Sequence, residues 1–333
     1  MRRRELLGAA TLALPALHAR AQTYPWRPDR PVSLIVPWAA GGSTDQMARI
    51  VAVELEEALG QKWVVVNQPG ASGSIGTRNA LLAAKDGLTW AAGAAIDIGC
   101  YRVLGLLDSG LDDWNLFFAV ANVNTIAANP SSPYKDFGQL LEAMKARPNV
   151  AVATAGQSSA GHNLMEAVRA AAGIQYRHAT YDGGNPAVLA TVAGETPVGA
   201  ALMVEMAEMI RGRRLIPLAA QSEQPVTLAG FGEIPSIRRW LPDIPAPLNY
   251  FGIWSAKGVP EPVVQTMAMV WEARIKGSQR LKDYAEQRAA VFTPLAGQAA
   301  RDGAWIAVRQ TAWLYHDGGK SKVAPDTVGI PRL

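Results

Sequence analysis

Ser72, Ser158 and His162 are the candidate residues for nucleophilic chemistry in this sequence. Both serines lie in segments rich in small residues, and His162 follows Ser158 by four positions. The elbow of a serine hydrolase needs the pattern G-x-S-x-G, whereas Gly156-Gln-Ser-Ser-Ala160 ends in alanine. The sequence also shows no obvious acid to orient the histidine. A secreted serine hydrolase is therefore an alternative, and ligand binding is the favoured interpretation.

The segment Pro37–Asp45 has the composition of an anion-binding loop. It follows the apolar run Val32–Val36, expected to be a strand, and leads into a helical pattern that ends at Gly60. Glycines allow a ligand to approach the backbone, and the first amides of a helix have no partner inside it. The alternative is an ordinary turn capped by Ser43 or Thr44. The candidate ligand contacts here are Trp38, Ala40, Gly41, Gly42, Ser43, Thr44 and Asp45.

Three further loops carry small and polar residues after expected strands. The loop Asn67–Gly76 can form a nest of backbone amides, and it lacks the Gly-Lys-Ser/Thr ending of a P-loop. The loops 156–162 and 182–185 offer hydroxyl, imidazole and amide groups. The candidate ligand contacts in and directly beside these loops are Ala71, Ser72, Ser158, Ser159, His162, Tyr181, Gly183 and Asn185.

The elements that carry these loops alternate between strand and helix patterns. Expected strands include Trp63–Val66 and Val150–Ala155, and expected helices include Phe137–Ala146 and Gly161–Ala172. Such alternation predicts an α/β fold with mostly parallel sheets. Ligands of open α/β sheets bind at the carboxyl ends of the strands. Two of the loops lie in the first third of the chain and two in the middle, which indicates a cleft between two lobes.

The start of the chain has the features of an export signal. Residues 1–21 combine a basic start, an apolar stretch too short to span a bilayer and an A-x-A cleavage pattern, so Gln22 is the expected mature start. Arg3-Arg4 also fits a twin-arginine signal, and an ordinary Sec signal is the alternative. Removal of this segment takes away four arginines and one glutamate. The net charge of +4 then falls close to zero, which gives no argument for nucleic-acid binding.

Cysteine and histidine usage excludes several kinds of site. Cys100 is the one cysteine of the sequence, so no internal disulfide is possible. The histidines show no spacing typical of a metal site. We predict neither a metal nor a cofactor.

Several motifs in order resemble the Bug-type periplasmic solute receptors of tripartite tricarboxylate transporters. The resemblance runs through nearly the whole chain after residue 21. Its motifs are Tyr24-Pro-Trp-Arg-Pro-Asp-Arg-Pro-Val32, Pro37–Asp45, Asn67–Gly76, Lys85-Asp-Gly-Leu-Thr89, Gly161-His-Asn-Leu164, Tyr181-Asp-Gly-Gly-Asn-Pro-Ala187, Pro242-Asp-Ile-Pro245 and Gly252-Ile-Trp254.

The resemblance implies a periplasmic-binding-protein-like α/β fold with two lobes, hinge strands and a ligand cleft. The first lobe is expected to span residues 22–122 and 250–333, and the second residues 123–249, with hinges at Phe118–Asn122 and Tyr250–Trp254. The implied function is to capture a small carboxylate-bearing ligand in the periplasm, as a monomer, and to deliver it to membrane transporter subunits. A sensor that signals to a membrane kinase is an alternative with the same fold.

Two acids depart from the family's pattern. Asp182 stands where the family commonly carries lysine, and Asp97, a further candidate ligand contact, lies where small or hydroxyl residues are usual. Extra acids oppose a second ligand carboxylate. We therefore expect an organic acid that also carries an amine or a ring nitrogen, unless Asp182 points to solvent.

Overall fold

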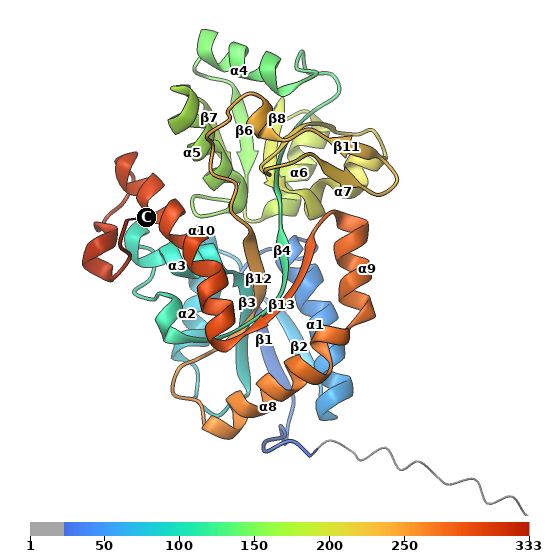
Figure 1. Cartoon of the computed structure of the whole chain (residues 1–333), viewed down its shortest axis with the longest axis vertical. Coiled ribbons are helices and arrows are strands. Elements are labelled where there is room, and N and C mark those ends of the chain that lie inside the picture. The colour runs from blue at the N-terminus through green and yellow to red at the C-terminus, as the bar shows by residue number, and fades with distance from the viewer. Residues whose placement is uncertain (1–22, 333) are drawn as a thin grey trace, which may run out of the picture.

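The structure is a computed structural model that describes residues 23–332. The expected export signal, residues 1–21, lies outside this part of the chain. Within the described residues, two large mixed sheets form two α/β lobes, one above the other in Figure 1.

The sheet of lobe 1 has six strands in the order β13-β4-β12-β3-β1-β2. These strands are β1 (Val32–Val36), β2 (Trp63–Asn67), β3 (Thr89–Ala94), β4 (Trp114–Asn122), β12 (Asn249–Ala256) and β13 (Val291–Ala296). One face packs against α1 (Ser43–Leu59), α8 (Glu261–Ala273) and α9 (Gln279–Arg288). The other face packs against α2 (Ser74–Leu82), α3 (Ala95–Leu104) and α10 (Gly297–Asp317).

The sheet of lobe 2 has five strands in the order β7-β6-β8-β5-β9. They are β5 (Asn124–Ala128), β6 (Ala151–Thr154), β7 (Arg177–Thr180), β8 (Val198–Leu202) and β9 (Ile216–Ala220). Helices α4 (Phe137–Ala146) and α5 (Ala160–Ala172) cover one face, and α6 (Gly184–Ala193) and α7 (Met203–Arg211) the other. Strands β10 (Val226–Leu228) and β11 (Gly232–Ile234) form a separate two-stranded sheet. The described residues also contain 3-10 helices at Ala71–Gly73, Leu111–Asp113, Ile237–Arg239, Ile275–Gly277 and Pro325–Val328.

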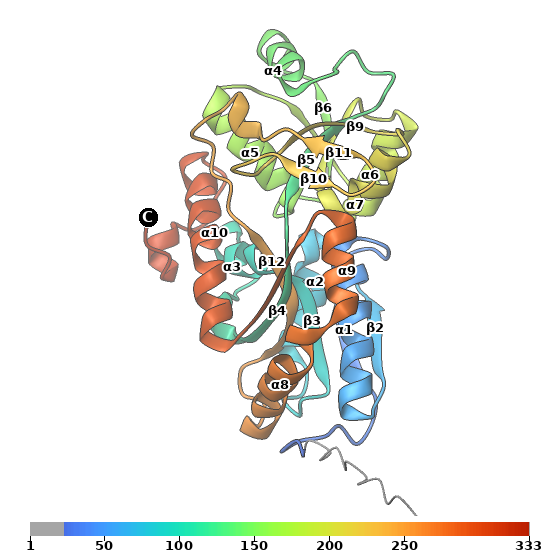
Figure 2. The same ribbon diagram turned by 45° about the vertical axis from the view of Figure 1, so that its right-hand side comes forward.

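Two chain crossings join the lobes. Strand β4 ends at Asn122 in the first sheet, and β5 begins at Asn124 in the second. Strand β12 returns to the first sheet at Asn249, whose register partner is Asn122. Figures 1 and 2 show both crossings in the middle of the molecule. We propose that the lobes divide at 122–123 and 249–250, as expected from the sequence.

The expectation of mostly parallel sheets is wrong. Strand β1 pairs in parallel with β2 and β3, and β6 with β7 and β8. Around the crossings, however, β12 runs antiparallel to β3 and β4, and β5 runs antiparallel to β8 and β9. One crossing leaves lobe 1 and the other returns to it, so these strands run in opposite directions. Alternation of strand and helix patterns carries no information about that direction.

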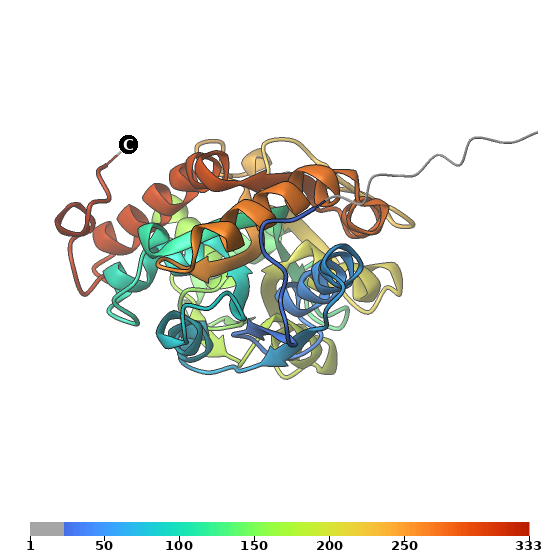
Figure 3. The same ribbon diagram turned by 90° about the horizontal axis from the view of Figure 1, so that it is seen from below.

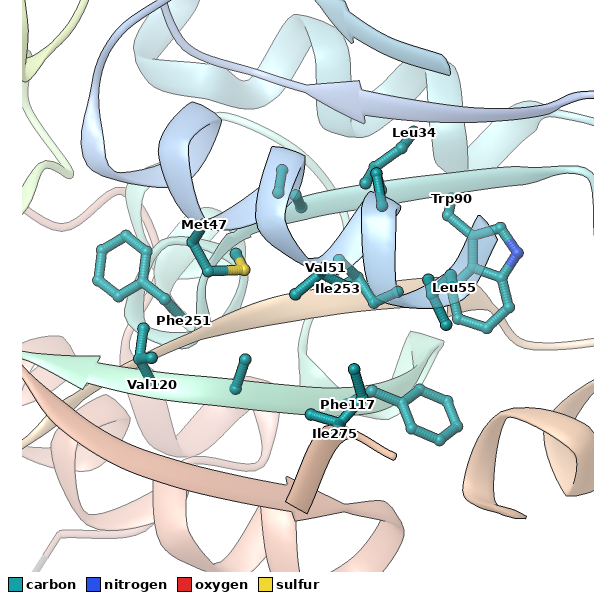
Figure 4. Packing of buried hydrophobic residues seen from close by; sticks show 14 of the residues in the cluster. Leu34, Met47, Val51, Leu55, Trp90, Phe117, Val120, Phe251, Ile253 and Ile275 are labelled. Carbon is teal, nitrogen blue, oxygen red and sulfur yellow. The ribbon is translucent and has the colours of Figure 1, made fainter. Parts of the chain in front are cut away.

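The largest core of lobe 1 lies between its sheet and α1. Figure 4 shows Val51 and Leu55 of α1 facing Ile253 of β12, while Met47 lies beside Phe251 at one end of the cluster. Helix α1 ends as expected at Gly60, whose φ of 75° is the left-handed conformation that glycine accepts readily. The opposite end of α1, at Ser43, is the one that contacts lobe 2.

The C-terminal segment closes lobe 1. In the view from below, the orange and red helices α8 to α10 cover one side, and the blue strands β1 and β2 lie on the other (Figure 3). Trp271 of α8 donates its indole N–H to the Phe118 carbonyl at 2.7 Å, which ties this segment to β4. Between residues 23 and 332 no helix is both long and apolar enough to cross a bilayer.

Candidate ligand-binding site

A cavity of about 40 Å³ lies between the two lobes, where helices from both sheets begin. Its lining includes first-turn or N-cap residues of α1 and α3 from lobe 1 and of α5, α6 and α7 from lobe 2. Each helix start presents amides without a partner in its own helix and the positive end of the helix dipole. The geometry therefore favours negative charge at this point.

On the lobe 1 side, Asp45 holds the loop before α1. Its carboxylate accepts the Gly41 amide at 2.9 Å and the Asn67 side-chain amide at 3.0 Å, and it pairs with Arg49 at 2.9 Å. Burial raises the pKa of Asp45, but the hydrogen bonds from Arg49, Gly41 and Asn67 outweigh it and lower the pKa overall. These contacts of Asp45 hold the loop that carries Gly42 and Ser43 into the cavity lining. Asp45 itself lies outside the lining.

On the lobe 2 side, α5 begins beside the end of β8. Ser159 is the N-cap and accepts the His162 amide at 3.4 Å. Gly161 packs so tightly that an added Cβ would lie 1.8 Å from the Ala200 carbonyl oxygen, so glycine is required there. This close approach brings Ala160 and Gly161, both in the first turn of α5, into the lining.

Glu205 connects the two sides of the cavity. It lies in the first turn of α7, where one carboxylate oxygen accepts the Leu202 amide at 3.2 Å. The other oxygen accepts the Ser43 amide at the start of α1 at 3.1 Å. Burial raises the pKa of Glu205, although these hydrogen bonds act in the opposite direction. A lobe 2 carboxylate thus occupies the helix start that the sequence offers to an anion.

Asp97 is the second acid in the lining. It belongs to the first turn of α3 and is only 5% exposed, and its Oδ1 has no hydrogen-bond partner among the described residues. Burial raises the pKa of Asp97 well above its ordinary value, a hydrogen bond with the Trp38 side chain opposes this, and the charge of Glu205 adds to the rise. The two acids are therefore electrostatically coupled.

The structure divides the residues expected from sequence into two groups. Those in the cavity lining are Trp38, Gly42, Ser43, Thr44, Asp97 and Ser159. Those outside the lining are Ala40, Gly41, Asp45, Ala71, Ser72, Ser158, His162, Tyr181, Gly183 and Asn185. Several of the second group join the lobes or support the loops instead.

Ser72 and Ser158 connect the lobes. The Ser158 hydroxyl donates to the Ser72 carbonyl at 3.3 Å, and the Ser72 hydroxyl accepts the Gln157 amide at 3.1 Å. In the part of the chain that the structure describes, neither serine is hydrogen-bonded to His162. The pairing of nucleophile and base that a serine hydrolase needs is not formed.

His162 belongs to a buried polar cluster between α5 and α10. Its Nδ1 contacts the Tyr315 hydroxyl at 3.0 Å, and its Nε2 lies 3.5 Å from a Glu166 oxygen. Glu166 also pairs with Lys320 at 2.6 Å. Burial, together with the stacked ring of His178, lowers the pKa of His162 to about 4. This imidazole is a neutral part of the lobe contact.

Sequence reasoning missed Glu205 and Phe251 as lining residues. Glu205 reads as an ordinary acid in the first turn of a helix, and Phe251 as a core residue of a strand. Asp182, by contrast, is exposed, and it is its backbone carbonyl that accepts the Ala39 amide at 3.2 Å. No pattern within α7 indicates that Glu205 meets the other lobe.

A family model described as the tripartite tricarboxylate transporter family receptor matches residues 47–292. The chain belongs to this receptor family. BugT from Bordetella pertussis is 33% identical over 221 residues, which cover 65% of this chain and 66% of BugT. The structure also resembles the periplasmic binding protein BugD, with a TM-score of 0.80, 23% identity and coverage of 88% of this chain and 99% of BugD.

A second solved structure, MatC from Rhodopseudomonas palustris with bound malate, aligns with a TM-score of 0.78 and 22% identity. The alignment covers 87% of this chain and 99% of MatC. Membership of the receptor family makes this chain a solute-binding receptor and not an enzyme. The hydrolase alternative is not supported.

Proposed function

We propose that this receptor encloses a small carboxylate-bearing ligand in the cavity between its lobes, outside the cytoplasm, and presents it as a monomer to membrane transporter subunits. The observation that carries the proposal is the convergence of five helix starts on one cavity within residues 23–332. First-turn amides at Ala160 and Gly161 are donors of the kind that a carboxylate accepts. MatC, whose structure contains malate, shares the fold.

Closure of the lobes forms part of the proposed function. Contacts between the lobes include the Ser43–Glu205, Ala39–Asp182 and Ser72–Gln157 hydrogen bonds. A ligand with contacts in both lobes shifts the population toward the closed form, and a membrane partner can select that form. The crossings near Asn122 and Asn249 are the proposed hinges.

The cavity volume constrains the ligand. About 40 Å³ accommodates a single charged group, which is less than a typical ligand pocket holds. We therefore propose that the bound form is slightly wider than the present one, with the carboxylate on α5 and the rest of the ligand between Trp38 and Phe251.

A thermal-shift screen tests this function. The panel contains monocarboxylates, dicarboxylates, tricarboxylates and amino acids, with the matching alcohols and amides as controls. A carboxylate at about 100 times its Kd should stabilise the protein by roughly 2.7 kcal/mol, and its uncharged analogue should not. A stabilising hit among the uncharged controls only would contradict a carboxylate ligand.

A further inference from the structure

Glu205 and Asp97 bring two acids into a cavity built from helix starts. Glu205 places its own carboxylate on the Ser43 amide, so the first turn of α1 is already satisfied by the protein. Asp97 is 95% buried, and its unpartnered Oδ1 belongs to a side chain that lines the same cavity. A buried acceptor without a donor costs free energy of folding. A donor on the ligand would satisfy Asp97 Oδ1.

Within residues 23–332, the lining of the cavity offers no positive side chain beside the two acids. None of the described residues in the cavity lining is Lys, Arg or His. Arg49, close in sequence to the α1 loop, is paired with Asp45. A second carboxylate brought by the ligand would face these two buried acids in a site of low dielectric constant, without a positive side chain among the described lining residues to offset its charge.

Aromatic rings complete the environment. Trp38, in the loop between β1 and α1, and Phe251, in β12, line the same cavity from lobe 1. The face of an indole or phenyl ring attracts a cation, most strongly where water is excluded. Carboxylates and ring faces together form the usual protein environment of an organic ammonium group.

We infer that Asp97 and Glu205 form a cation subsite, and that the ligand of this receptor carries a protonated nitrogen in addition to its carboxylate. This inference rests on the proposed function. The ligand nitrogen donates to Asp97 Oδ1 and lies near Glu205, while the ligand carboxylate lies on the first turn of α5. Diacids and tricarboxylates are disfavoured because their second carboxylate meets the two acids.

Calorimetry on the purified protein with matched probes tests the inference. One series contains butanoate, 4-aminobutanoate and succinate, and a second contains benzoate and 4-(aminomethyl)benzoate. Butylamine and benzylamine serve as probes without a carboxylate. In at least one series, the amino acid should bind about tenfold or more tightly than its partners that lack the nitrogen.

Variants assign the preference to the two acids. Asp97→Asn and Glu205→Gln keep the shape and a hydrogen-bond acceptor but cannot carry a negative charge opposite the ligand nitrogen, so each should reduce the preference about tenfold. Asp182→Asn is the matched control, because its carboxylate is exposed and outside the lining. Thermal unfolding should show all three variants folded, since neutral side chains are easier to bury than carboxylates.

Each outcome decides between the proposals. Tighter binding of butanoate, benzoate or succinate than of both amino acids, or a preference that survives in both variants, overturns the cation subsite and leaves the carboxylate receptor intact. Binding of the simple amines without any carboxylate-bearing probe supports the subsite and overturns the proposed carboxylate. Failure of every probe overturns both.

Discussion

The backbone amide of Ser43 and the carboxylate of Glu205 are hydrogen-bonded at 3.1 Å although the two residues are 162 positions apart. Ser43 begins α1 in lobe 1, and Glu205 lies in the first turn of α7 in lobe 2. The Glu205 carboxylate accepts a hydrogen bond at the start of α1 and so joins the two lobes. A bound carboxylate could make the same kind of contact. The bond links lobe closure to the chemistry of the cavity.

Replacement of Glu205 by Ala should shift the ligand-free protein toward open forms. The variant loses a hydrogen bond to a charged group, with a typical net value of about 1.5–3 kcal/mol. Small-angle scattering should show a larger radius of gyration. Glu142→Ala, on the exposed surface of α4, is the control. An unchanged scattering curve for Glu205→Ala would show that this bond does not determine closure.

Gly184→Ala should displace the Glu205 carboxylate. An added Cβ at Gly184 would lie 2.1 Å from Glu205 Oε2, so one of the two must move. We expect about 1–3 kcal/mol of lost stability from this overpacking, together with weaker ligand binding. Chemical denaturation and calorimetry measure the two effects. At Gly277 an added Cβ meets nothing within 4 Å, so Gly277→Ala is the control. Equal behaviour of the two variants would contradict this prediction.

Protonation of Glu54 should lower the free energy of unfolding at acidic pH. Glu54 accepts the Ser278 hydroxyl at 2.7 Å and pairs with Arg274 at 2.8 Å and Arg280 at 3.2 Å. Burial raises the pKa of Glu54, but these three partners outweigh burial and lower it below 4.5. Because the folded pKa is lowered, the contribution is complete above the unfolded pKa and is lost as the pH falls through the folded pKa.

Replacement by Gln tests the role of Glu54. Glu54→Gln should cost about 1–3 kcal/mol at pH 7, a modest value because both arginines are partly exposed. The difference from the unmodified protein should shrink as denaturation is repeated at pH values below about 4.5. A constant difference at every pH would mean that packing, and not charge, explains the loss.

His162 should stay neutral in the folded protein until the pH approaches about 4. Burial is the main cause, and the stacked ring of His178 adds to it. The unfolded chain binds a proton near the ordinary value of 6.5, so stability should decrease as the pH falls from about 6.5 to about 4. The slope from this group is at most about 1.4 kcal/mol per pH unit.

Nuclear magnetic resonance of the His162 ring measures its pKa in the folded protein. Urea denaturation across the same pH range measures the dependence of stability on pH. His162→Gln should flatten the slope between pH 4 and 6.5. Titration of the folded His162 ring near its ordinary pKa would show that water reaches it, and the lobe contact around Tyr315 would then be looser than the structure indicates.

Local sequence determined the elements around the site. The unit of β1, loop and α1 was predicted because its strand, glycine loop and helix are consecutive, and its end at Gly60 follows from one residue's left-handed conformation. Helix α4 was predicted with its observed bounds, Phe137–Ala146, because its buried apolar residues recur at helical spacing. Helix α3, which carries Asp97, was missed because it follows β3 without a turn, and its residues are buried all round.

Tertiary structure alone decided which of these residues meet. Small and polar loops after the strands were predicted from the sequence, but Ser72 and Ser158 join the lobes and Asp45 supports its loop. The antiparallel crossings at β4 and β12 bring α7 over α1, and only then does Glu205 reach Ser43. Hydrophobic periodicity and turn residues specify local conformation, whereas the pairing of distant helix starts depends on strand direction and on packing of whole lobes.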